Sequence, residues 1–181
     1  MPESPLIVDE CEFPSASVLH PDYVDKAYFH DSYRTLLTRP DSNVVAIFFA
    51  IFGHRPMWMK LVMVARNWLA SLVGIQSPSS AEIMNPELKS SYAVGDKIGA
   101  WPIFVLNHHE LVAGRDNKHL DFRLSILRET GGSDGETASA VVSTVCTVHN
   151  RFGKVYLFFI VPFHKWGVRW LIRSAGLAGR L

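Results

Sequence analysis

The chain has 181 residues, of which 48% are apolar and 19% charged, and its formal net charge is +1. This length is typical of one domain with a substantial core, and the composition argues against long disordered segments. The sequence lacks the dense runs of Lys and Arg with which nucleic-acid-binding proteins contact phosphates. We therefore expect a neutral or weakly charged small molecule as partner, and no nucleic acid.

The first 20 residues are rich in Pro and Ser and have no periodicity, so we expect a tail over 1–20 and a single domain over 21–181. The opening residues are acidic and proline-rich, unlike a secretory signal. Cys11 and Cys146 form neither a metal-ligand pattern nor a disulfide framework. These features favour a reducing, cytoplasmic location.

Two helices are predicted after a loosely alternating stretch over 22–34. Asp41 and Ser42 can cap a helix that ends near Gly53, and Pro56 can open a second helix that ends at Gly74. The apolar run 44–52 is about half of the roughly 20 residues that span a bilayer, so we expect a buried helix and no integral membrane segment. A membrane-dipping helical pair is the alternative.

From about residue 92 the apolar period changes from 3.6 toward 2, which predicts strands. Their expected ranges are Lys97–Trp101, Ile103–His109, Leu111–Gly114, Lys118–Arg128, Ala138–His149 and Lys154–Val161. GGSDG at 131–135 is a strong hairpin signal, and the short connections indicate antiparallel pairing.

A helix is predicted from Pro162 to the C-terminus. Its expected core stripe consists of Phe163, Trp166, Gly167, Trp170, Leu171 and Ser174. Lys165, Arg169 and Arg173, spaced four residues apart, form a basic stripe on another side. The whole pattern predicts an α+β fold in which a curved antiparallel sheet wraps around a long C-terminal helix, with two short helices near the N-terminus.

The segment HLDFRL at 119–124 alternates ionisable and apolar residues, as a strand with two different faces would. If His119, Asp121 and Arg123 point into a cavity, they are candidates for ligand recognition or acid–base chemistry. The alternative is that they lie on the solvated outer face while their apolar neighbours fill the core, which is the energetically cheaper arrangement. Asp116 and Asn117 are typical of a hairpin turn.

His164 follows Pro162 and is either a polar group at the mouth of a cavity or a helix-end histidine bonded to a loop. His108 and His109 are adjacent, and neighbours on a strand point to opposite faces, so we expect no metal site. Nucleotide-binding and nucleophilic-serine motifs are absent from the sequence, and we expect no cofactor.

The element order resembles the helix-grip fold of the START and Bet v 1-like (SRPBCC) superfamily, whose cavity holds lipids, sterols or polyketides. Three stretches are also similar to the bacterial domain-of-unknown-function family 2867, usually grouped with that superfamily. They are PMWMKLVMVARNWLASLVGI at 56–75, HLDFRL at 119–124 and VYLFFIVPFHKWGVRWLIR at 155–173. The resemblance implies a fold and supplies no catalytic residues.

Three functions remain open. The first is a small-molecule-binding protein with a hydrophobic cavity between the sheet and the C-terminal helix. Its expected lining is Trp58, Trp101, Phe122, Tyr156, Phe158, Trp166 and Trp170. The second is a cofactor-free cyclase, dehydratase or hydrolase that uses the His and Asp candidates in the same cavity. The third is a module that docks a protein or an anionic membrane surface through its basic stripe.

Overall fold

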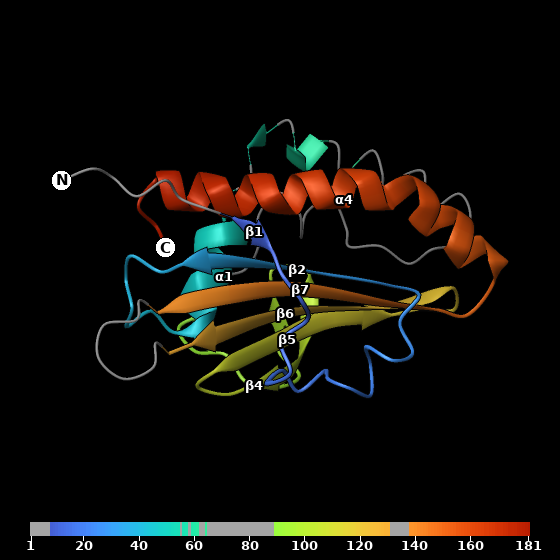
Figure 1. Cartoon of the computed structure of the whole chain (residues 1–181), viewed down its shortest axis with the longest axis horizontal. Coiled ribbons are helices and arrows are strands. Elements are labelled where there is room, and N and C mark those ends of the chain that lie inside the picture. Colours follow the sequence, from blue (N-terminus) through green and yellow to red (C-terminus); the bar gives the residue numbers. More distant parts are fainter. Residues whose placement is uncertain (1–7, 55, 58, 62–63, 65–88, 131–137) are drawn as a thin grey trace.

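The computed structural model describes residues 8–54, 56–57, 59–61, 64, 89–130 and 138–181. Seven antiparallel strands form a sheet in the order β1-β2-β7-β6-β5-β4-β3 (Figure 1). The strands are β1 (Asp9–Glu10), β2 (Phe29–Leu36), β3 (Lys97–Ile98), β4 (Trp101–Leu106), β5 (Glu110–Asp116), β6 (Leu120–Glu129) and β7 (Ser139–Val148). Helices α1 (Val44–Phe52) and α4 (Arg151–Leu177) lie on one side of the sheet, here called its inner face. The fold is α+β, consistent with a helix-grip layout.

The alternation in β6 sets the two faces of the sheet. Phe122, Leu124 and Ile126 contribute to the main apolar core together with residues of α1 and α4. Since successive side chains of a strand point to opposite faces, Asp121 and Arg123 belong to the outer face. The apolar set of HLDFRL is therefore inside, and Asp121 and Arg123 are outside. His119 precedes β6 in the β5–β6 turn and lies beside the start of α4, with its ring centroid 4.8 Å from that of Phe152.

The meander is formed as the sequence predicts. β6 and β7 pair in register from Leu120 opposite Val148 to Glu129 opposite Ser139, as expected for a hairpin. The predicted GGSDG turn lies outside the described residues. Asn117 confirms the predicted turn between β5 and β6, because its side-chain oxygen accepts hydrogen bonds from the backbone amides of His119 and Leu120.

Helix α1 begins after Asn43, whose side chain accepts a hydrogen bond from the amide of Ala46 at 2.8 Å. The predicted caps, Asp41 and Ser42, therefore lie just before the true cap. Of the second predicted helix, residues 57, 59–61 and 64 are helical and Pro56 precedes them outside the helix. The other residues of the predicted range lie outside the described part of the chain.

The predicted strand Lys154–Val161 is wrong, because these residues are the beginning of α4. Asn150 caps this helix by accepting a hydrogen bond from the amide of Gly153 at 3.1 Å. A Cβ at Gly153 would lie 2.5 Å from the carbonyl oxygen of His119, so glycine lets the first turn approach the β5–β6 turn closely. Pro162 lies inside the helix rather than at its start.

The predicted core stripe of the last helix is also partly wrong. Val168, Leu171, Ile172 and Ala175 are buried against the core, whereas Phe163 and Trp166 are exposed. The apolar residues of this segment extend around most of the helix, so a 3.6 period alone does not select the buried side. The side of the helix that is buried is determined by its packing on the sheet.

Residues 8–28 cover part of the outer face, which differs from the tail expected over 1–20 (Figure 1). Leu19 is 2% exposed and packs with Val112 and Val145. Glu110, buried beneath this segment, accepts hydrogen bonds from the Ser17 hydroxyl at 2.6 Å, the Val18 amide at 2.8 Å and the Ser125 hydroxyl at 2.5 Å. This carboxylate fastens the N-terminal segment to β5 and β6.

Glu110→Ala should lower the free energy of unfolding by about 3 kcal/mol, because it leaves two buried hydroxyls and the part-buried Val18 amide without an acceptor. It should also accelerate amide exchange over 17–19, measured by hydrogen–deuterium exchange. Glu12→Ala removes the same charge from an exposed position and should change the stability by less than about 0.5 kcal/mol. Equal effects of the two variants would contradict the fastening role.

Candidate functional site

A buried polar cluster lies on the inner face between β2 and α4. The Asp31 carboxylate accepts a hydrogen bond from the Tyr33 hydroxyl at 2.9 Å, and its other oxygen lies 3.3 Å from Nε2 of His164. The Asp31 side chain is 1% exposed, whereas that of His164 is 20% exposed. We call Asp31, Tyr33 and His164 the inner-face cluster.

The sequence of β2 explains why these groups meet. In FHDSYRTL, Asp31, Tyr33 and Thr35 alternate with His30, Ser32 and Arg34, so the first three share one face. Asp31 and Tyr33 are two residues apart, which brings the phenol to the carboxylate. His164 reaches them from α4 and stacks edge-on against Phe29, with ring centroids 5.8 Å apart.

Two buried hydroxyls adjoin the cluster without hydrogen-bond partners. Thr144 in β7 lies directly opposite Asp31, and Thr35 follows Tyr33 on the same face. Both residues are at most 2% exposed. Buried hydroxyls are nearly always hydrogen-bonded in folded proteins. The region therefore retains capacity for one or more further polar groups.

The environment of the cluster favours the neutral forms of Tyr33 and of the nearby Cys146. Burial, together with the charge of Asp31 and its hydrogen bond, raises the pKa of the Tyr33 phenol far above its ordinary value. Burial and the same carboxylate raise the pKa of the Cys146 thiol to about 12. Tyr33 is thus a permanent hydrogen-bond donor at neutral pH, and Cys146 is a poor nucleophile.

Within the cluster, the His164–Asp31 pair is the part that could take part in acid–base chemistry or bind a ligand. A carboxylate bonded to one ring nitrogen fixes the orientation of an imidazole. His164 is also the member that reaches the surface, so it can meet a molecule that enters beside α4. The pair can hold a polar group or transfer a proton.

The structure separates the four residues suggested by the sequence. Asp121 lies 3.0 Å from His149, and Arg123 pairs with Asp116, both on the outer face. Arg123 is buried rather than solvated, with the Phe104 ring 3.8 Å from its guanidinium carbon. The Asn150 amide group lies beside Nδ1 of His119. Only His164 of these four belongs to the inner-face cluster.

The aromatic residues suggested as a ligand lining divide into two groups. Trp101 and Phe122 are in contact within the core, with their ring centroids 5.6 Å apart. Trp170 and Tyr156 are half-buried against core residues. Phe158 and Trp166 are exposed on α4 and do not line the space between helix and sheet. Trp58 lies outside the described residues.

No group of three or more His, Cys, Asp or Glu side chains within the described residues could hold a metal ion. His108 and His109 lie in the connection between β4 and β5 rather than on a strand.

Asp31 and Tyr33 were missed by the sequence analysis. The available signal was the alternation of HDSYR, which places an acid and a tyrosine on the face opposite His30 and Arg34. That pattern does not reveal which face is inner, because both faces carry polar residues. The contact with His164, 133 positions away, depends on the tertiary fold.

A known family matches most of the chain. The family described as "Protein of unknown function (DUF2867)" matches residues 23–171, which include strands β2 to β7 and most of α4. The chain belongs to this family. Searches of curated proteins and of solved structures give no match.

The DUF2867 match includes the whole inner-face cluster, since Asp31, Tyr33 and His164 all lie within it. Among the described residues, no helix of this DUF2867 protein is both long enough and apolar enough to cross a bilayer.

A double-mutant cycle tests the Asp31–Tyr33 hydrogen bond. Tyr33→Phe should lower the free energy of unfolding by about 1 kcal/mol, and Asp31→Ala by about 2–3 kcal/mol because it leaves the phenol without its acceptor. The free energy of unfolding of the double variant should fall by about 1 kcal/mol less than the sum of the two single-variant effects. Urea denaturation measures all four proteins, and strict additivity would show that the bond contributes nothing.

The Cys146 pKa predicts a pH effect on stability. Since the folded pKa of about 12 exceeds the ordinary 9.0, unfolding releases a proton between these values, and stability should fall as pH rises above about 9. Cys146→Ala should flatten this decline of stability with pH. The slope that remains includes the contribution of Tyr33, whose pKa is also raised in the folded protein. Denaturation at pH 8 to 10.5 provides the measurement, and Cys11→Ala is the comparison: burial also raises the pKa of that thiol, but the Cys11 side chain is less deeply buried, so Cys11→Ala should flatten the decline less than Cys146→Ala does. An unchanged slope in Cys146→Ala would contradict the assignment.

Proposed function

We propose that this protein binds a small, mainly apolar molecule between the sheet and α4, and that the inner-face cluster holds the molecule's polar group. The observation that carries the proposal is the buried Asp31 carboxylate, which joins His164 and Tyr33 beside two unpartnered threonine hydroxyls. A charge in an apolar interior is costly, and ligand-binding sites are where such groups are found.

The chemistry of the cluster favours a hydroxyl- or carbonyl-bearing ligand. Thr144 and Thr35 can each donate and accept a hydrogen bond, and the His164 imidazole can do either according to its protonation. Asp31 carries negative charge when ionised, which disfavours an anionic group beside it. A sterol-like or polyketide-like molecule with one or two oxygens meets these requirements better than a phosphate ester.

The apolar part of the ligand would contact the aromatic residues that face the interior. Trp101, Phe122, Trp170 and Tyr156 are the candidates for this wall. The resemblance to the helix-grip superfamily supports the same location, since its members hold lipids, sterols or polyketides between sheet and helix. Membership in that superfamily and a cytoplasmic location are part of the proposal.

A second candidate function is catalysis in the same place. The His164–Asp31 pair has the arrangement of a general base and its orienting carboxylate, which contributes about 10²–10⁴-fold to a rate when aligned with substrate. A cofactor-free cyclisation, dehydration or hydrolysis fits such a base. Conversion of a bound ligand, lost in His164→Gln while binding persists, would distinguish catalysis from simple binding.

The first test is native mass spectrometry of the purified protein, followed by identification of any released compound. Thermal-shift and calorimetric titrations would then use a sterol, a fatty acid and an aromatic polyketide. Asp31→Asn and His164→Gln should each weaken binding by about tenfold or more, equivalent to about 1.4 kcal/mol. The sterol and the polyketide should bind more tightly than the fatty acid.

The outer face provides a matched control pair. Asp121 and His149 form a second Asp–His contact at 3.0 Å, remote from the inner face, so Asp121→Asn and His149→Gln should leave ligand affinity unchanged. The proposal fails if none of the compounds binds and none co-purifies. It fails equally if the outer-face variants weaken binding as much as the inner-face variants.

A further inference from the structure

Helix α4 exposes a continuous set of large apolar side chains on the side away from its buried stripe. Val155, Phe158, Phe159, Phe163 and Trp166 each expose between 56% and 74% of their accessible surface. Val155, Phe159, Phe163 and Trp166 are spaced i, i+4, i+8 and i+11, so they lie along one side of the helix. We call these five residues the aromatic face.

Such a surface is costly for a protein that remains surrounded by water. Scattered single apolar residues on a surface are ordinary, but a contiguous group of large ones marks a place that meets another apolar phase. The main core does not need these side chains, since Val168, Leu171, Ile172 and Ala175 already attach α4 to it. The aromatic face is therefore available for a second contact.

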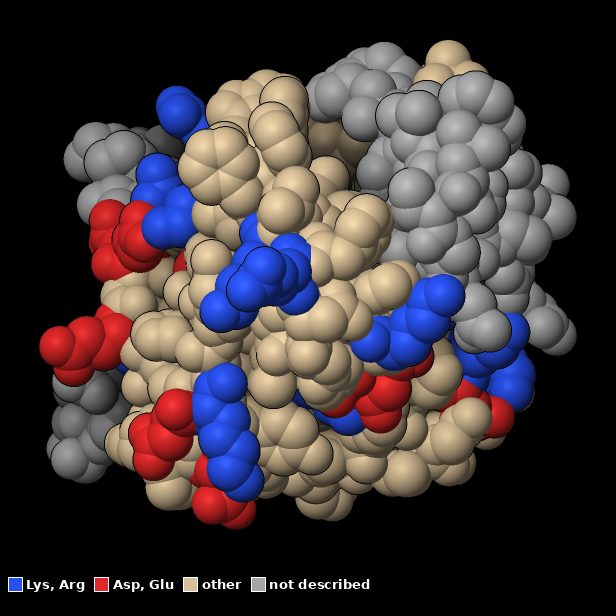
Figure 2. Space-filling model, turned by 90° about the vertical axis from the view of Figure 1, so that its right-hand side faces the viewer, with Lys and Arg blue, Asp and Glu red and all other residues tan. Residues whose placement is uncertain are grey.

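The charge of α4 identifies the chemistry of that contact. The helix contains five basic residues and no Asp or Glu: Arg151, Lys154, Lys165, Arg169 and Arg173. Arg151 and Lys154 precede the aromatic face along the helix. Lys165 lies beside its last residue, and Arg169 and Arg173 follow it. In Figure 2, Lys and Arg atoms lie among uncharged residues, with Asp and Glu atoms beside several of them. The arrangement is an apolar centre with basic residues toward both ends.

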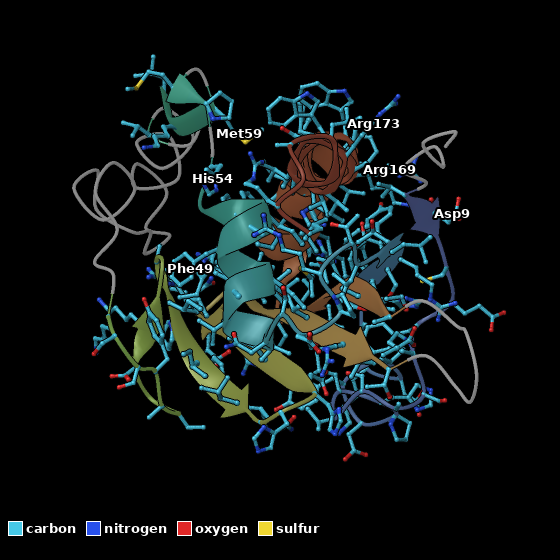
Figure 3. The ribbon with its side chains drawn as sticks, turned by 90° about the vertical axis from the view of Figure 1, so that its left-hand side faces the viewer. Asp9, Phe49, His54, Met59, Arg169 and Arg173 are labelled. Carbon is cyan, nitrogen blue, oxygen red and sulfur yellow. The ribbon has the colours of Figure 1, made fainter. Side chains whose placement is uncertain are left out.

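Part of this positive charge remains uncompensated. Glu10 pairs with Lys165 at 3.0 Å and with Arg169. Arg151 and Arg173, near the two ends of the helix, form no ion pair with any described residue. Figure 3, viewed from the left-hand side of Figure 1, places Arg173 on the side of α4 away from the sheet, while Arg169 lies nearer β1. Arg173 can thus reach an anion that the aromatic face contacts.

We propose that α4 attaches the protein to an anionic lipid bilayer, with the helix parallel to the membrane surface and the aromatic face in the headgroup–acyl boundary. Helices with basic residues beside Trp and Phe insert about 5–10 Å in this way without spanning. Trp166 suits this depth, because indole rings favour the interface. The opposite side of α4 stays packed on the sheet.

The charge pattern favours a bilayer over a protein partner or a second copy of this chain. An anionic membrane supplies many negative groups in a plane beside an apolar layer, which matches a convex helix with basic residues toward both ends. Two copies joined through their aromatic faces would bring the α4 helices of both copies together, and Glu10 of each copy offsets only part of the charge of the five basic residues on its own helix. Like charges in such proximity disfavour that dimer.

Vesicle co-sedimentation of the full chain tests the proposal. Binding is expected to phosphatidylserine–phosphatidylcholine vesicles at about 0.02 M salt, with much weaker binding to pure phosphatidylcholine and at about 0.5 M salt. Phe158→Glu/Phe163→Glu should abolish binding, and Arg173→Glu should weaken it by about tenfold. These side chains are exposed, so the variants should fold, as circular dichroism would verify.

The controls are exposed residues elsewhere on the molecule. Val94→Glu places the same charge at a position that is 60% exposed and outside α4, and Arg39→Glu reverses an exposed charge near α1. Neither should reduce binding by more than about twofold. Equal losses in controls and α4 variants would overturn the proposal, as would failure to bind anionic vesicles at low salt.

Analytical ultracentrifugation tests the alternative that a second copy of the chain binds the aromatic face. A concentration-dependent dimer that Phe158→Glu/Phe163→Glu converts to monomer would assign the aromatic face to a second copy and overturn the membrane proposal. A monomer at all concentrations, together with vesicle binding, supports it. Ligand binding by the inner-face cluster is measured without vesicles, so either proposal can fail while the other stands.

Discussion

The rotation of α4 about its own axis determines most of what is distinctive about this protein. Burial of Val168, Leu171, Ile172 and Ala175 against the inner face fixes that rotation, because these side chains have no other place in the core. The same rotation brings His164 to Asp31. It also leaves the aromatic face exposed. One packing contact therefore sets both the interior site and the exposed surface of the helix.

The two buried carboxylates illustrate how a structural acid differs from a candidate functional one. Glu110 accepts three hydrogen bonds from Ser17, Val18 and Ser125, and its role in fastening the N-terminal segment accounts for its burial. Asp31 has the Tyr33 phenol and a longer contact with His164, which itself is partly exposed. The unpartnered Thr144 hydroxyl lies opposite Asp31. An acid with a purely structural role would not need an unpartnered hydroxyl beside it.

The sequence predicted the sheet better than the helices, for a physical reason. In β6, ionisable and apolar residues alternate clearly, so the period of two identifies a strand. The alternation leaves open which face is buried, although burial of the apolar set is the energetically cheaper arrangement. The residues 154–161 are apolar on almost every side, and such a run satisfies a strand and a helix equally well. The cap that decides the matter is Asn150 with Gly153, and its effect depends on the approach of the helix to His119.

The site was predictable only in part, because its members come from distant elements. His164 was identifiable from the sequence as a polar residue in an apolar helix, but Asp31 was not, since β2 carries polar residues on both faces. The outer-face residues Asp121 and Arg123 were suggested because they are close in sequence. Their partners, His149 and Asp116, show that local charge patterns in a sheet often end in local ion pairs. Contacts between a strand and a helix more than a hundred residues away require the fold.

The two proposals for α4 support each other in energetic terms. A mainly apolar molecule partitions into a bilayer rather than into water, so a protein that binds it from the membrane surface begins where the molecule is most concentrated. The same helix would then contact the membrane through the aromatic face and present His164, which is partly exposed, beside the interior cluster. Attachment through one side of α4 leaves its packing on the sheet intact. Such a division of one helix between two apolar environments would account for a sequence that is apolar almost all around and contains no acid.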